Sequence, residues 1–312
     1  MTDLLTPPEG LTTIRDFIRW GASRFVESGL VFGHGTDNAL DESAALVLHS
    51  LHLPFNLSSE YFSAVLTPAE RHSVCALIAR RIHERKPLAY LTGQAFFAGL
   101  SFFVDERVLV PRSPIAELIE QDFEPWLEAS TVGRVLDLCT GSGCIAIACA
   151  FAFPDAEIDA VELSPQALEV AAINVTEYGL ESRLHLIESD LYAQLDEQQY
   201  DLIVSNPPYV NRAEWEQLAE EFRAEPEMGL VAGERGLDCV HGILEGAASR
   251  LNEHGILVVE VGSSAQAIIE AYPSLPFLWL DFERGGDGVF LLTAEQLRQC
   301  PEPASLPRDI CR

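Results

Sequence analysis

Hydrophobic residues in the first part of the chain recur every three or four positions, the spacing of one buried face of an α-helix. The pattern occurs three times before Pro87. At the third stretch, Thr67 and Glu70 have the spacing of a capping box, and Pro68 suits the first helical position. These features predict a small all-helical domain over residues 1–88.

Two short aromatic runs around a glycine, within residues 94–104, favour a β-hairpin, and we predict a hairpin connector over residues 89–112. Over residues 113–312, short apolar runs alternate with helical stretches, which is typical of an α/β domain with a mostly parallel sheet. The expected strands are Arg134–Leu138, Glu157–Glu162, Leu184–Glu188, Tyr200–Ser205, 255–261, 277–282 and 288–292. The segment 284–288 is too short for a helical crossover, so the last two of these strands should form an antiparallel hairpin.

Composition indicates a folded protein of a reducing compartment. Hydrophobic residues make up 48% of the chain and its mean hydropathy is +0.11, enough for a real core. The longest apolar run, 144–153, is about half as long as a membrane span, and no signal peptide is recognisable. Seven cysteines without a CxxC pair fit reduced thiols better than disulfides or a zinc site. We therefore expect a cytoplasmic protein with no membrane association and no bound metal.

The net charge of the chain limits the classes of molecule that it is expected to bind. The chain has 48 acidic residues against 20 basic ones, a net charge of −28, and Lys86 is the single lysine. Such a field repels nucleic-acid phosphate and attracts basic partners. The acid excess fits a basic protein partner, but it also fits plain solubility or a saline cytoplasm, and the sequence leaves both open.

The first candidate binding motif runs from Asp137 to Gly143, where a buried strand ends in a glycine-containing turn before a helix. Glycines there allow the backbone to approach a ligand, with the helix N-terminus beyond. Glu162 ends the next strand and Asp190-Leu191 follow the third, so they face the same crevice and suit ribose hydroxyls and a base. The glycine spacing also fits a nicotinamide dinucleotide, so the motif alone predicts a nucleoside site and leaves the nucleoside undecided.

The second motif, Asn206-Pro207-Pro208-Tyr209, directly follows the apolar fourth strand. Two prolines lock the backbone after Asn206 and leave fixed carbonyl acceptors. The Asn206 side-chain oxygen and the Pro207 carbonyl can each accept one N–H of a planar NH₂ group, and Tyr209 can stack on its plane. This tetrapeptide predicts a binding site for an amide or an exocyclic amine.

These motifs, their order and the terminal hairpin resemble the class I S-adenosylmethionine-dependent methyltransferases. More closely, the chain is similar to the protein N(5)-glutamine methyltransferase family, whose members have a helical N-terminal domain, a hairpin connector and this tetrapeptide. The similarity extends to about Leu297. Within the family, residues 33–38, 104–118 and 137–144 look like the branch that modifies a glutamine of large-subunit ribosomal protein number three. The release-factor branch, which usually has glycine at the position of Cys139, is the alternative.

The resemblance implies a class I methyltransferase fold, with a seven-stranded sheet, behind a helical domain that recognises the substrate. It implies that Asn206 and Pro207 are catalytic, and that Pro208, Tyr209 and Arg112 also bind substrate. The implied S-adenosylmethionine-binding residues are Asp137, Cys139, Thr140, Gly141, Ser142, Gly143, Glu162, Asp190, Leu191 and Asn206. The implied partner is a basic ribosomal protein, modified before or during ribosome assembly.

The chemistry of an amide fits such a site. An amide nitrogen is a weak nucleophile, and as it attacks a methyl group it gains positive charge, so its N–H groups become better donors. Two fixed acceptors, at Asn206 and Pro207, would therefore bind the transition state more strongly than the ground state. We expect no general base, because the methylated amide loses its proton readily to solvent.

Three other functions fit parts of the sequence. An adenine-N6 methyltransferase would present the same NH₂ geometry to the tetrapeptide, but the charge of −28 argues against direct nucleic-acid binding. A nicotinamide-dependent oxidoreductase would explain the glycine turn and leave the tetrapeptide unexplained. A chaperone for a basic ribosomal protein would explain only the acidity.

Overall fold

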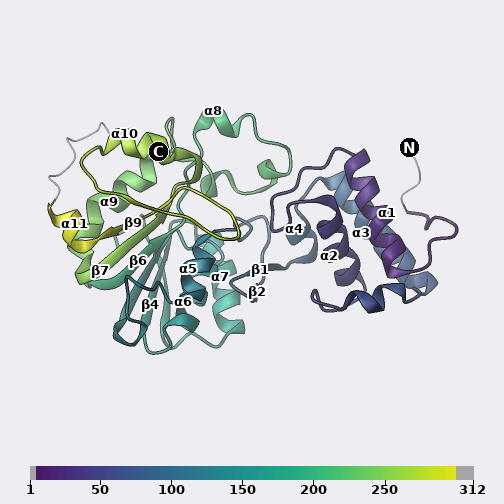
Figure 1. Cartoon of the computed structure of the whole chain (residues 1–312), viewed down its shortest axis with the longest axis horizontal. Helices are drawn as coiled ribbons and strands as arrows, with labels where there is room; N and C mark the ends of the chain where they lie inside the picture. The colour runs from purple at the N-terminus through teal and green to yellow at the C-terminus, as the bar shows by residue number, and fades with distance from the viewer. Residues whose placement is uncertain (1–4, 300–312) are drawn as a thin grey trace. The chain divides into compact units, whose positions relative to one another are not determined.

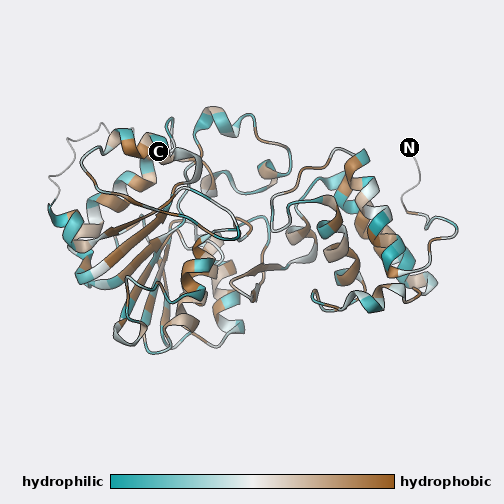
Figure 2. Ribbon diagram, in the orientation of Figure 1, coloured by the Kyte–Doolittle hydropathy of each residue, from teal (hydrophilic) through white to brown (hydrophobic). Residues whose placement is uncertain are grey.

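The computed structural model describes residues 5–299, which divide into two units. One unit contains the chain up to Gln94 together with Ala219–Ala224, and the other contains Ala95–Leu218 and the chain from Glu225 onward. Hydrophobic positions line the strands of the second unit and the inner faces of the helices of both (Figure 2). Within residues 5–299, no helix has the length and apolarity required to span a bilayer.

The first unit is helical. Its elements are α1 (Ile14–Glu27), α2 (Ala39–Ser50), the 3₁₀ turn η1 (Ser59–Ser63), α3 (Pro68–Glu84) and α4 (Leu88–Thr92). The expected capping box is present at α3, where Thr67 N–H donates to Glu70 at 2.7 Å and Glu70 N–H donates to the Thr67 hydroxyl at 3.3 Å. Phe17, Leu46 and Ile78, one from each long helix, are completely buried in the core of this unit.

The second unit opens with the predicted hairpin, β1 (Ala95–Phe97) and β2 (Leu100–Phe102). A side chain of helix α7 (Pro165–Glu177) and its C-terminal neighbour hold the hairpin in place. Asn174 accepts from Phe103 N–H at 2.8 Å and donates to its carbonyl at 3.0 Å. Tyr178 donates to the Ser101 carbonyl at 2.7 Å. The hairpin therefore packs on the α/β core of this unit.

A seven-stranded sheet forms the centre of the second unit (Figure 1). Its strands are β3 (Arg134–Leu138), β4 (Glu157–Glu162), β5 (Leu184–Glu188), β6 (Tyr200–Ser205), β7 (Leu251–Glu260), β8 (Leu278–Leu280) and β9 (Val289–Thr293). Their order is β5-β4-β3-β6-β7-β9-β8, parallel from β5 to β7, with β9 antiparallel to both β7 and β8. The predicted fold class, including the antiparallel terminal hairpin, is confirmed.

Helices cover both faces of this sheet (Figure 1). On one face lie α5 (Ile115–Glu120), α6 (Cys144–Ala152) and α7, and on the other lie α9 (Asp238–Arg250), α10 (Ala265–Ala271) and α11 (Ala294–Gln299). Because both faces are buried, the inner strands β6, β7 and β9 each contain an uninterrupted apolar run rather than an alternating pattern. Since β3, β4, β5, β6 and β7 run in the same direction, their carboxyl ends lie at one edge of the sheet, and the polar residues of the motifs gather there.

The connection between β6 and β7 is long. It contains α8 (Arg212–Trp215) and the 3₁₀ turns η3 (Phe222–Ala224) and η4 (Glu227–Gly229). Its base is closed by a parallel bridge between Val210 and Val231. Its middle part, Ala219–Ala224, belongs to the helical unit, where the buried Glu221 carboxylate pairs with Arg85 at 2.6 Å and accepts from Val31 N–H at 3.2 Å.

Candidate active site

The turn after β3 has the backbone that its glycines predict. Cys139, Gly141 and Gly143 all have positive φ, of 60°, 55° and 80°. A Cβ added at Gly141 would meet no atom of residues 5–299 within 4 Å, so the backbone there borders open space in the described structure. Glycine takes this conformation without steric cost, and the turn delivers the chain to the N-terminus of α6.

Asp137, at the buried end of β3, ties this turn to α6. One of its carboxylate oxygens accepts from the Thr140 hydroxyl and from Ala146 N–H, the latter at 3.1 Å. The other oxygen, Oδ1, has no hydrogen-bond partner within residues 5–299. Burial raises the pKa of Asp137 to about 7, with a smaller contribution from the nearby Glu162 carboxylate.

Glu162, at the end of β4, reaches across to the same turn. Its Oε2 accepts from Gly141 N–H at 3.0 Å, and its Oε1 accepts from Leu163 N–H and Ser164 N–H at 2.9 and 3.0 Å. The carboxylate is therefore fixed beside the glycine turn. Because a carboxylate has about four acceptor positions, it can still accept from a ligand hydroxyl.

Asp190 and Leu191 follow β5 at the same edge, and they differ in environment. The Asp190 residue is exposed. Leu191 has a φ of 47° and packs so closely on Gly242 of α9 that a Cβ there would lie 2.5 Å from its Cδ1. Sequence spacing did not predict this packing, which anchors the turn to α9. From the same helix, Cys239 neighbours the Cys139 thiol.

Asn206 and Pro207 follow β6 and carry the two oxygens that the sequence analysis proposes as amide acceptors. Within the described part of the chain, the Asn206 side chain has no hydrogen-bond partner, and no donor reaches the Pro207 carbonyl. Both residues line a pocket. A polar oxygen that faces a pocket without a protein donor is available to a ligand.

Tyr209 is held on three sides. Its phenol donates to the Glu260 carboxylate at 3.0 Å, and its backbone carbonyl accepts from the Ser264 hydroxyl at 2.7 Å. Its ring lies against Gly262, where a Cβ would be 2.6 Å from the ring carbon Cε2. Burial raises the pKa of the Tyr209 phenol, and the neighbouring Glu260 carboxylate raises it further.

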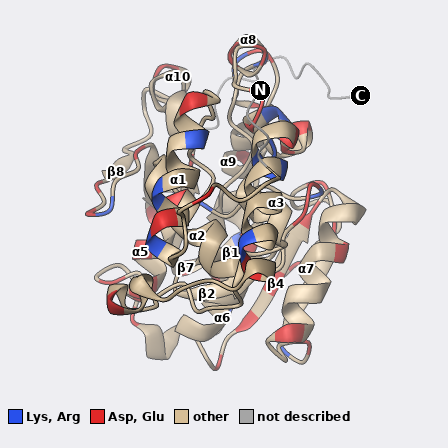
Figure 3. Ribbon diagram, turned by 90° about the vertical axis from the view of Figure 1, so that its right-hand side faces the viewer, with Lys and Arg blue, Asp and Glu red and all other residues tan. Residues whose placement is uncertain are grey.

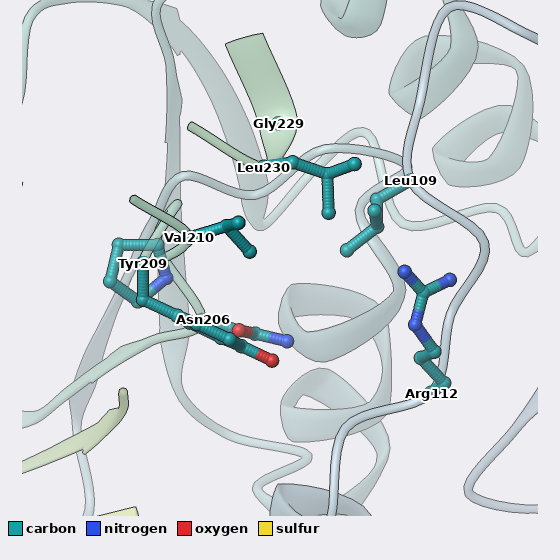
Figure 4. A pocket seen from close by; sticks show the side chains of 8 residues that line it. Leu109, Arg112, Asn206, Tyr209, Val210, Gly229 and Leu230 are labelled. Atoms are coloured by element: carbon teal, nitrogen blue, oxygen red, sulfur yellow. The ribbon is translucent and has the colours of Figure 1, made fainter. Parts of the chain in front are cut away.

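The pocket beside this tetrapeptide combines apolar walls with a few polar groups (Figure 4). Its lining residues are Leu109, Arg112, Asn206, Pro207, Tyr209, Val210, Gly229 and Leu230. Arg112 lies on the side opposite Asn206 and Tyr209 in Figure 4. Pro208, which the sequence also places in the site, is not among the lining residues.

The buried Glu225 carboxylate fixes the position of the Arg112 side chain. Its two terminal nitrogens donate to the two oxygens of Glu225, at 2.6 and 2.7 Å. Glu225 also accepts from Val110 N–H at 3.0 Å, and it is only 3% exposed. This two-point geometry gives the guanidinium one orientation at the pocket wall.

Sequence reasoning missed several residues of the site. Glu260 ends a parallel strand at the ligand-binding edge, and the rule that singled out Glu162 could have found it. Glu225 lies in an irregular segment, 113 positions from the arginine that it holds, and no local signal marks it. The apolar wall from Leu109, Val210 and Leu230 likewise depends on tertiary folding.

One protein-family model and two relatives with similar sequences all carry the name of a methyltransferase. Residues 123–234 match the Methyltransferase small domain family. The chain is 54% identical to a protein of Neisseria meningitidis serogroup B called ribosomal protein uL3 glutamine methyltransferase, over 92% of this chain and 95% of that protein. A protein of the same name from Xanthomonas campestris pv. campestris is 53% identical over 92% of this chain and 93% of its own length.

Proposed function

The chain belongs to the family of the ribosomal protein uL3 glutamine methyltransferases, and from this premise we propose that it methylates the side-chain amide of a glutamine in uL3, the large-subunit protein number three. The observation that carries the proposal is the pair of acceptor oxygens on Asn206 and Pro207, which have no protein donor within residues 5–299 and belong to residues that line a pocket. Membership of the family makes the chain a methyltransferase.

The pocket suits a glutamine side chain in both of its parts. The two methylene groups of glutamine can lie along Leu109, Val210 and Leu230, which removes apolar surface from water. The terminal NH₂ can then donate to the Asn206 side-chain oxygen and the Pro207 carbonyl. An asparagine is one methylene shorter and cannot reach both the apolar wall and the acceptors equally well.

The same two acceptors favour the reaction. Positive charge develops on the amide nitrogen as it attacks, and its N–H groups then bind more strongly to oxygens that are already in position. Pro207 and Pro208 limit backbone motion behind the acceptors, so little reorganisation accompanies the charge change. The proton that leaves the methylated nitrogen can go to solvent, so the site requires no dedicated base.

The turn after β3 fits S-adenosylmethionine as the cofactor. Cys139 to Gly143 would surround its methionine part, Glu162 would accept from the ribose hydroxyls, and Asp190 with Leu191 would border the adenine. The open space beside Gly141 and the fixed Glu162 carboxylate support this assignment. When bound, S-adenosylmethionine supplies an activated methyl group as the electrophile.

The charge of the chain supports a basic protein substrate. Acidic positions occur along α7 and α10 of the second unit, whereas α1 of the helical unit carries both acidic residues and arginines (Figure 3). With a net charge of −28, the surface favours approach of a cationic ribosomal protein and disfavours nucleic acid. We place the reaction in the cytoplasm, on free uL3 before or during ribosome assembly, with the helical unit recognising the substrate protein.

Transfer of a labelled methyl group to purified substrates tests this function. Wild-type protein is incubated with labelled S-adenosylmethionine and, separately, with uL3, a peptide chain release factor or adenine-containing single-stranded DNA. The proposal predicts label on uL3 alone, at a glutamine identified by tandem mass spectrometry. Label on the release factor would move the chain to the other branch of the family, and label on DNA would refute amide methylation.

A further inference from the structure

Glu260 is a buried acidic residue bonded to Tyr209, which lines the pocket, and neither the sequence nor the proposed reaction gives it a role. It is the last residue of β7, at the same edge of the sheet as the turn after β3. Glu260 is only 5% exposed, and burial raises the pKa of its carboxyl group. A buried carboxyl of this kind is costly unless each of its oxygens is hydrogen-bonded.

Both oxygens of Glu260 are hydrogen-bonded; one donor lines the pocket, and the other directly follows a residue that lines it. Oε1 accepts from the Tyr209 phenol at 3.0 Å, and Oε2 accepts from the Ser113 hydroxyl at 2.5 Å. Tyr209 ends the tetrapeptide that carries the two amide acceptors. Ser113 directly follows Arg112, the lining residue that lies opposite Asn206 and Tyr209 in Figure 4. One carboxylate therefore connects the two sides.

The hydroxyl of Ser113 is itself part of a chain of contacts. It also accepts from Ile115 N–H at 3.2 Å, at the start of α5. On the Tyr209 side, the backbone carbonyl accepts from the Ser264 hydroxyl, and the ring packs so closely on Gly262 that a Cβ there would lie 2.6 Å from it. Both ends of this bridge are therefore held by further hydrogen bonds, so a shorter side chain at position 260 could not keep both hydroxyl contacts without movement of one segment.

We propose that Glu260 is a positioning residue for methyl transfer, which keeps the Tyr209 ring and the Arg112–Ser113 segment at a fixed separation across the amide pocket. This role rests on the proposed function, because the pocket it shapes is the one assigned to glutamine. Glu260 acts through Tyr209 and Ser113 and takes no part in bond making.

Ionisation of Glu260 matters for this role, because the carboxylate can accept from both hydroxyls at once. A protonated carboxyl becomes a donor at one oxygen and opposes one of the two hydroxyl donors. The charged and titratable groups that face it are Tyr209 from the tetrapeptide, Arg112 from the segment before α5, and Asp287 from the turn before β9. Since burial raises its pKa, the carboxyl takes up its proton at higher pH than an ordinary glutamate.

The experiment measures kcat, KM for uL3 and cofactor affinity in four variants: Glu260→Gln, Glu260→Ala, Tyr209→Phe and the double variant Tyr209→Phe with Glu260→Gln. Glu253→Gln, an exposed position on the same strand, is the matched control. We expect Glu260→Ala to lower kcat by roughly 10²-fold, the scale of a misplacement of about 1 Å, with cofactor affinity unchanged. Glu260→Gln keeps the shape and should lose less.

Two readouts separate positioning from a purely structural role. First, Glu260→Gln should lower kcat less in the Tyr209→Phe background than in the wild type, because part of its effect passes through the phenol. Second, wild-type kcat should fall on the acid side of the pH profile, and this fall should be absent in Glu260→Gln. Circular dichroism and thermal unfolding of each variant report whether the fold is intact.

The outcomes distinguish this inference from the proposed function. If the wild type methylates uL3 but the effects of Tyr209→Phe and Glu260→Gln are simply additive and the acid limb persists in Glu260→Gln, the positioning role is wrong. A Glu260→Ala variant that is folded and fully active would also overturn it. If the wild type methylates no glutamine at all, the proposed function itself fails.

Discussion

A methyl group added at Gly262 should reduce catalysis by displacing Tyr209. Gly262 follows β7 with a φ of +42°, and its Cα faces the Tyr209 ring. A Cβ at this position would lie 2.6 Å from Cε2 and 2.8 Å from Cζ of that ring. Normal carbon–carbon contacts lie at about 3.5–4.0 Å, so the ring would have to retreat by roughly 1 Å.

Gly262→Ala should change both the stability of the protein and its kcat. Alanine in the left-handed region costs about 1–2 kcal/mol, part of which is offset by the lower entropy of the unfolded chain. Overpacking against the ring adds about 1–3 kcal/mol of destabilisation. A shift of about 1 Å at a group that lines the pocket can lower kcat by on the order of 10²-fold.

Gly285→Ala provides the matched control for Gly262→Ala. Gly285 also has a positive φ, of 85°, but a Cβ there would meet no atom within 4 Å. Both variants are compared by thermal unfolding, cofactor titration and labelled-methyl transfer to uL3. We expect Gly285→Ala to retain nearly full kcat and Gly262→Ala to lose most of it while still binding cofactor. Equal kcat in the two variants would refute the argument that the Tyr209 ring must stay in place.

Three further predictions concern other parts of the molecule. Asn206→Ala should bind S-adenosylmethionine normally and lose most turnover, because one of the two amide acceptors is gone; an unchanged kcat in single-turnover assays would contradict its role. Arg81→Met should lower the free energy of unfolding by about 3–5 kcal/mol in urea titrations, because it removes the partner, at 2.6 Å, of the fully buried Glu42 carboxylate; a loss below about 1 kcal/mol would contradict this. Burial raises the pKa of Asp137 to about 7, so the folded state holds a proton that the unfolded chain has released, and stability should fall as the pH rises from about 4 to about 7. Asp137→Asn should flatten this part of the stability profile, measured by thermal unfolding across the pH range, and an unchanged slope would show that another group causes it.

Much of the fold could be predicted because its signals are local. The strands from Arg134 to Ser205 are apolar runs bounded by turn residues, and the four predicted ranges coincide with β3, β4, β5 and β6. The predicted strand at 255–261 corresponds to β7, which begins earlier, at Leu251. Leu251 pairs with Tyr200 through an irregular register that no sequence period reveals.

The candidate site likewise contains residues that the sequence predicts and residues that only the folded chain reveals. Glu162, Asp190 and Asn206 lie at or just after the carboxyl ends of parallel strands, so topology alone brings them to one edge of the sheet. The residues that fix their surroundings are distant in sequence. The bond from Arg112 to Glu225 depends on the full path of the chain between β6 and β7.

A structure of the protein bound to a uL3 segment that contains its target glutamine tests the central claim most directly. The account predicts that the glutamine amide nitrogen lies at about 2.7–3.2 Å from both the Asn206 side-chain oxygen and the Pro207 carbonyl, with its methylene groups against Leu109 and Leu230. A bound glutamine whose amide nitrogen contacts neither oxygen would contradict the account.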